Sequence, residues 1–69
     1  MIYEVRWRPL NDDRQHRSPH QLSTADATDF ACALLDHTAV FDIWIVDSGG
    51  QTVIRMPEIA RRRQARKGH

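Results

Sequence analysis

Cysteine is almost absent from this sequence, which contains only Cys32 in 69 residues. A single cysteine excludes an intramolecular disulfide, the cross-link that small secreted domains usually need, so we expect a protein of the reducing cytoplasm. Long apolar runs are absent too, and none approaches the roughly 20 residues of a membrane span. The stretch MIYEVRWRPL alternates charged and apolar residues where a signal peptide needs a continuous apolar segment. We therefore expect neither membrane insertion nor export.

Motifs for catalysis and for cofactor or metal binding are also missing. The DSGG stretch lacks the Gly-Lys-Ser/Thr ending of a phosphate-binding loop. His16 and His20 are four residues apart, but Pro19 argues against a helix there, and no third ligand lies at a recognisable spacing, so we expect no metal. Cys32 lies at the border of an apolar helix face, where a buried and unreactive thiol is expected. These observations predict a non-enzymatic protein without a cofactor.

The residues that are present predict a folded domain with uneven charge. Hydrophobic residues make up 41% of the chain and charged residues 28%, which is ordinary for a soluble domain, and the length allows one domain with a thin core. Residues 1–55 contain five arginines and eight acidic residues, a net charge of −3, whereas residues 56–69 contain five basic residues and Glu58, a net charge of +4. We therefore divide the chain into an α+β domain, residues 1–56, and a basic C-terminal helix or tail, residues 57–69.

A strand is predicted near the start of the chain. Tyr3, Val5 and Trp7 alternate with charged residues, which is the period of a strand with one buried face, and Pro9 ends it. The polar segment PLNDDRQHRSPHQ that follows is predicted to be a loop.

A helix is predicted over LSTADATDFACALLDHT, residues 22–38. Ser23 is its expected N-cap, and Leu22 is placed for a hydrophobic staple. The helix is amphipathic. Its apolar side consists of Ala27, Phe30, Ala31, Leu34 and Leu35. Its outer side carries an acidic stripe of Asp26, Asp29 and Asp36.

A hairpin is predicted over VFDIWIVDSGGQTVIRM, residues 40–56, because two β-branched runs flank glycines that can supply the positive φ of a tight turn. The predicted core positions of the hairpin are Phe41, Ile43, Ile45, Ile54 and Met56. Trp44 then lies on the opposite face of the sheet, beside Arg6, Arg8 and Arg55.

The predicted order is thus β-α-β-β, a two-layer α+β domain with one main helix on a three-stranded sheet and a right-handed crossover between the first two strands. An open edge of such a sheet can accept a partner strand, so a homodimer through a strand edge is one possible assembly. Pro57 at a first helical position predicts a short second helix, anchored at its start by Ile59 and Ala60 and frayed beyond.

The strand YEVRWR, the helix DATDFACALL and the hairpin FDIWIVDSGGQTV together resemble small β-α-β-β proteins of bacteriophages and other mobile elements, a group that includes some anti-CRISPR proteins. The resemblance covers residues 2–56 and lies in the arrangement of the elements. It implies a non-enzymatic protein that acts by binding, and it supplies no functional residues.

Two surfaces of the domain are candidate partner-binding sites. Trp44 among arginines could anchor a protein interface or stack on a base. Alternatively, an arginine packs over its ring, or the C-terminal segment folds back over it through Ile59. The acidic stripe could present negative charge to a basic partner and compete with its nucleic acid, or it is simply the wet face of a helix.

The basic end is the third candidate surface. Its members are Arg61, Arg62, Arg63, Arg66 and Lys67. They could hold the phosphates of a nucleic acid, or form a solvated extension that contacts an acidic protein. We expect a cytoplasmic inhibitor that binds a protein or nucleoprotein complex and blocks its engagement of nucleic acid. The alternative is a module that binds nucleic acid directly through the basic C-terminus.

Overall fold

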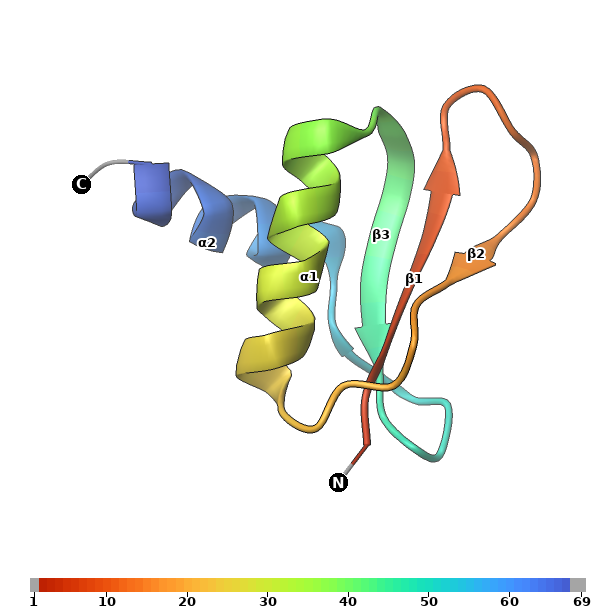
Figure 1. The fold of residues 1–69 in the computed structure, drawn as a ribbon, viewed down its shortest axis with the longest axis vertical. Helices are drawn as coiled ribbons and strands as arrows, with labels where there is room; N and C mark the ends of the chain where they lie inside the picture. The colour runs from red at the N-terminus through yellow and green to blue at the C-terminus, as the bar shows by residue number, and fades with distance from the viewer. Residues whose placement is uncertain (1, 68–69) are drawn as a thin grey trace.

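The computed structural model describes residues 2–67, with the backbone alone for residues 66 and 67. The elements are β1 (Glu4–Pro9), β2 (His16–Arg17), α1 (Thr24–His37), β3 (Val40–Val46), β4 (Thr52–Ile54) and α2 (Met56–Lys67). The strands form one antiparallel sheet in the order β2-β1-β3-β4. Both helices lie on the same side of this sheet (Figure 1). The predicted α+β class with two layers is confirmed.

The sheet differs from the prediction in strand number and direction. β2 is a fourth strand inside the segment predicted as a loop, and it pairs with β1. Ser18 stabilises this turn of the chain, because its buried Oγ accepts a hydrogen bond from the Val5 backbone N–H at 2.9 Å and donates one to the Pro19 carbonyl at 2.7 Å. β1 and β3 run antiparallel, so the predicted right-handed crossover is wrong, since that rule governs parallel strands.

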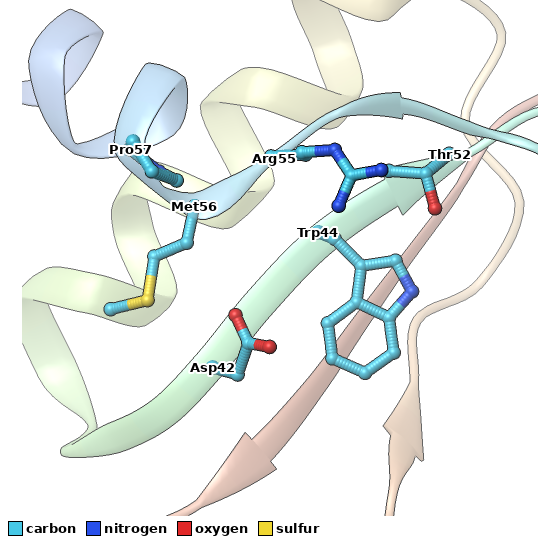
Figure 2. A pocket seen from close by; sticks show the side chains of 6 residues that line it. All are labelled: Asp42, Trp44, Thr52, Arg55, Met56 and Pro57. Atoms are coloured by element: carbon cyan, nitrogen blue, oxygen red, sulfur yellow. The ribbon is translucent and has the colours of Figure 1, made fainter.

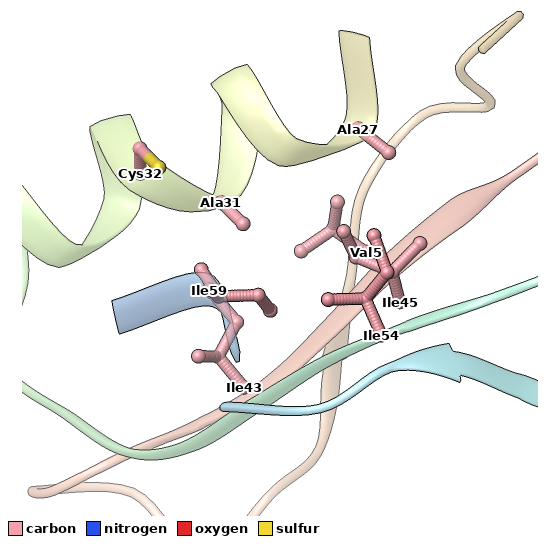
Figure 3. Close-up of a cluster of buried hydrophobic side chains, with 8 residues drawn as sticks. All are labelled: Val5, Ala27, Ala31, Cys32, Ile43, Ile45, Ile54 and Ile59. Atoms are coloured by element: carbon pink, nitrogen blue, oxygen red, sulfur yellow. The ribbon is translucent and has the colours of Figure 1, made fainter. Parts of the chain in front are cut away.

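The core lies between the sheet and the helices (Figure 3). Its buried members are Val5, Ala27, Ala31, Cys32, Ile43, Ile45, Ile54 and Ile59. The small side chains of α1 allow the helix to approach the strands closely, and the larger residues Phe30, Leu34 and Leu35 close its margins. The predicted apolar side of α1 is therefore confirmed.

Hydrogen bonds between residues close in sequence define the start of α1 and the hairpin turn. Ser23 is the N-cap of α1, and its Oγ accepts a hydrogen bond from the Asp26 N–H at 3.0 Å. In the turn, Asp47 Oδ1 accepts hydrogen bonds from the N–H groups of Gly49 and Gln51, and Gly50 has a φ of 83°. That φ favours glycine, so the predicted turn chemistry is confirmed.

Phe41 is an exception to the predicted core, with 65% of its surface exposed. β1 and β3 pair Arg8 with Asp42 and Pro9 with Val40, so Phe41 is an extra residue at a β-bulge. A bulge interrupts the alternation of side chains between the two faces. As a result Val40 packs against the core, while the Phe41 ring lies under the Arg8 guanidinium at 5.9 Å.

The helix α2 is docked on the domain as far as Arg63, where we predicted fraying after its start. Ile59 is fully buried in the same core as the strands. Further along, Arg62 Nη1 approaches Thr28 Oγ1 of α1 at 3.5 Å, and Arg63 Nε donates a hydrogen bond to Asp36 Oδ1 at 2.6 Å. The predicted stop at Gly68 lies outside the described residues.

Candidate functional site

The face of the sheet opposite the helices, called the outer face below, is covered by no other element of residues 2–67 (Figure 1). Pairing places Arg17 opposite Arg6, and Arg6 opposite Trp44. Arg55 follows β4 directly, and because Ile54 pairs with Ile45, Arg55 comes beside Trp44. The sheet therefore carries Arg17, Arg6, Trp44 and Arg55 in one line across its strands, the Trp44 row.

Trp44 forms a wall of a shallow groove with a volume of about 430 Å³ (Figure 2). The groove is lined by Asp42, Trp44, Thr52, Arg55, Met56 and Pro57. Its indole is half-buried and projects from β3 on the same side as the Arg55 side chain (Figure 2). The predicted position of Trp44 on the outer face, next to Arg6 and Arg55, is thus what the register gives.

Neither an arginine packed over the Trp44 ring nor a C-terminal segment folded over it through Ile59, the two alternatives raised by the sequence, is found among the described residues. Within residues 2–65, whose side chains are described, the cation–π contact is that of Arg8 with Phe41, and it does not involve Trp44. Ile59 points into the core on the other side of the sheet, so the C-terminal segment does not fold over the indole through this residue. The Trp44 ring is therefore left as part of an open surface.

Glu4 organises the charges at one end of the Trp44 row. Its Oε1 lies 3.2 Å from Arg17 Nε and 3.7 Å from Arg6 Nε, so one carboxylate serves two guanidinium groups. Arg6 Nε is buried and has no hydrogen-bond acceptor among the described residues. Arg8 and Arg55, which are exposed, form no ion pair with any described acidic side chain. The positive charge of the outer face is consequently only partly neutralised.

The three aspartates of the acidic stripe on α1 have different surroundings. Asp26 and Asp29 are exposed on the helix surface. Asp36 binds Arg63 of α2, so its carboxylate contributes to the packing of the two helices. The Asp36 carboxylate is therefore already engaged within the chain.

The basic end is also partly neutralised within the chain. Arg61 forms an ion pair with Glu58, and Arg62 Nε lies 3.2 Å from the same carboxylate. The hydrogen bond from Arg61, followed by that from Arg62, holds the pKa of Glu58 below its usual 4.5. The predicted phosphate-binding residues Arg66 and Lys67 belong to α2, but their side chains lie outside the described residues.

The remaining candidate residues for metal binding and reactivity are the histidines and Cys32. His16 stacks on Trp7, with 5.6 Å between ring centroids, and its Nε2 lies 3.1 Å from Asp12 Oδ2. No group of three or more metal-binding side chains occurs in the part of the chain that the structure describes. Cys32 is only 3% exposed. This burial raises the pKa of its thiol, and the Asp36 carboxylate raises that pKa further, so the thiol is protonated at neutral pH. This is the predicted environment of a buried thiol.

Sequence reasoning missed two residues of the outer face. Arg17 belongs to a polar segment without alternation, and it joins the Trp44 row only because β2 pairs with β1. Phe41 reaches the outer side through the bulge described above. Neither feature has a local sequence signal, because both depend on pairing with β1.

Comparison with known proteins gives no relative. No protein-family model, no curated protein and no solved structure matches the chain. Neither helix among the described residues has the length and apolar character needed to cross a bilayer.

Proposed function

We propose that this protein is a small, non-enzymatic binding protein of the cytoplasm that attaches to a protein or nucleoprotein complex and blocks its engagement of nucleic acid. In this proposal it acts in the manner of the inhibitors of defence systems that phages and other mobile elements encode, such as anti-CRISPR proteins. The observation that carries the proposal is the uncovered outer face with Trp44 between Arg6 and Arg55.

The composition of this face supports binding. Tryptophan and arginine are among the residues that most often dominate the binding energy of interfaces. Trp44 lies beside a groove and is flanked by the guanidinium groups of Arg6 on β1 and of Arg55, which directly follows β4. Exposed apolar surface lowers solubility, and on small domains it often marks an interaction site.

An immunity assay tests the proposal. Bacteria with an active CRISPR system targeting a phage are made to express the chain, and phage plating is measured against an empty vector. We expect restored plating, lost in a Trp44→Ala, Arg55→Ala double variant and kept in Arg14→Ala, which removes an exposed charge away from the outer face. Circular dichroism confirms that each variant is folded. Equal plating by the double variant and the unaltered chain would refute a role for this face.

The second candidate is direct nucleic-acid binding through the basic C-terminus, proposed because the helix α2, Met56–Lys67, carries five basic residues and one acidic residue, a net charge of +4. Its test is removal of residues 61–69, which keeps Ile59 in the chain and should abolish a salt-dependent affinity for DNA or RNA, with circular dichroism to show that the shortened chain is folded. Unchanged affinity after the deletion would reject this candidate.

The possible homodimer through a strand edge is tested by the oligomeric state in solution. In the described sheet the edge strands β2 and β4 are two and three residues long. Such short edges offer few backbone groups for pairing, so we expect a monomer in analytical ultracentrifugation, and a stable dimer would show that an edge is used.

A further inference from the structure

The Trp44 row has the dimensions of an extended binding track. Neighbouring strands lie about 4.8 Å apart, so a line through four of them spans roughly 14 Å. The row places guanidinium groups on both sides of one indole, with Arg17 and Arg6 on one side and Arg55 on the other. A second aromatic, Phe41, lies three residues from Trp44 on the same strand, with Arg8 over its ring.

The charge on the outer face suits an anionic partner. Strand pairing places the acidic side chains of Glu4 and Asp42 on this face, and Asp12, Asp13 and Asp47 lie at its margins, the first two beside Arg8 and the last near Arg6. Glu4 is already held between Arg6 and Arg17, and Asp42 Oδ1 accepts a hydrogen bond from the Ile43 N–H at 2.9 Å. On the strands themselves, four arginines therefore share the face with two carboxylates, of which Glu4 is held by arginines. A partner that brings phosphate groups would complement the remaining positive charge.

The indole offers a π-face in the same place. No guanidinium covers Trp44 within the described side chains, and the groove beside it is open. Aromatic rings on the face of a sheet bind unpaired bases by stacking, whichever base is present, while arginines follow the backbone. A base in a duplex cannot reach the ring, and the outer face carries no helix that could enter a major groove.

We infer that the outer face binds single-stranded nucleic acid, with a base stacked on Trp44 and the flanking phosphates held by Arg6, Arg8 and Arg55. This inference rests on the proposed function, because it names the component of a nucleoprotein complex that the face contacts: its unpaired strand. Occupying that strand blocks the complex without any acidic mimicry by α1.

Fluorescence anisotropy with labelled oligonucleotides of about 16 nucleotides, the upper end of the site size of one small binding domain, tests the inference. The probes are single-stranded oligo-dT and oligo-rU and a duplex of the same length, at about 50 to 200 mM salt. We expect the single strands to bind more tightly than the duplex, and Trp44→Ala to weaken binding about 10-fold, within the range that one stacked base contributes. Absence of single-strand binding at the lowest salt would overturn the inference.

A charge-matched pair of variants locates the site. Arg8→Gln with Arg55→Gln removes two charges from the outer face, and Arg61→Gln with Arg62→Gln removes two from α2. Losing two single-strand phosphate contacts should flatten the dependence of log affinity on log salt by about 1.4 in the first variant and leave the second near the unaltered slope. Equal effects, or a larger effect of the α2 pair, would overturn the assignment to the outer face.

Tryptophan fluorescence gives an independent readout, since Trp7 and Trp44 are the two tryptophans and Trp7 packs against the core. Stacking should quench the emission of the unaltered chain, and Trp44→Phe should abolish this quenching; quenching that persists would contradict the inference. The immunity assay separates the two proposals. Restored plating without oligonucleotide binding rejects this inference and keeps the proposed function with a protein contact. Oligonucleotide binding without restored plating keeps the assignment of the outer face to single strands and rejects the proposed inhibition.

Discussion

Replacing Ile59 with alanine tests most directly whether α2 is part of the folded domain. The side chain is fully buried beside strands and α1, so Ile59→Ala loses the transfer free energy of its methyl and methylene groups and leaves a cavity. Such changes cost about 2–5 kcal/mol. A domain of 69 residues is stable by about 3–10 kcal/mol in total, so this one change removes a large part of the stability.

Leu22→Ala is the matched control, because it deletes the same number of carbon atoms from a residue that is 79% exposed. Its expected cost is within about 0.5 kcal/mol. Urea unfolding followed by circular dichroism measures both variants. With a slope of about 1 kcal/mol per molar urea, Ile59→Ala should lower the midpoint by about 2 M or more. If Ile59→Ala leaves no folded protein, Ile59→Val should cost about 0.5–1.5 kcal/mol. A midpoint for either Ile59 variant equal to that of Leu22→Ala would refute the docking of α2.

Three further predictions concern single groups. Ser18→Ala leaves the buried Val5 N–H without its acceptor and should cost about 1–3 kcal/mol in urea unfolding, while Ser48→Ala in the exposed turn should change stability by less than about 0.5 kcal/mol; equal costs would contradict this. Because the folded pKa of Glu58 lies below 4.5, its stabilising contribution is present above that pH and lost as the pH falls through the folded value. Glu58→Gln should therefore lower the urea midpoint at neutral pH and leave it unchanged in strong acid, and a deficit that is the same at both pH values would contradict the ionic role. The Cys32 thiol should react with a thiol reagent only slowly until denaturant is added, and fast reaction of the native protein would contradict its burial.

The elements of the fold could largely be predicted because each has a local cause. Alternation in β1, the Ser23 cap of α1 and the glycine-containing turn each act within a few residues. β2 could not be predicted, because two polar residues have no periodicity, and both their pairing with β1 and the hydrogen bond from Val5 N–H to Ser18 Oγ join segments that are far apart in sequence. The position of Phe41 failed for a related reason: a bulge is set by the register with β1, and strict alternation along β3 does not reveal it.

The candidate site was predictable in part. The alternation of β1 and β3 was enough to place Trp44 with Arg6 on the face opposite the core. The ion pair between Asp36 and Arg63 joins residues that are far apart in sequence, so the acidic stripe and the basic end looked independent. Their partial mutual neutralisation follows only from the packing of α2 against α1.

The late position of Ile59 also bears on how the chain folds during synthesis. A ribosome that has made residues 1–55 has made every described strand and the whole of α1, yet the residue that closes the core among them is still missing. The partly made chain would leave Ile43 and Cys32 without one of their neighbours, with apolar surface open to aggregation or to chaperones. We therefore expect the cooperative folding step to wait until residue 59 has emerged, so that the segment with the highest positive charge is also the one that completes the domain.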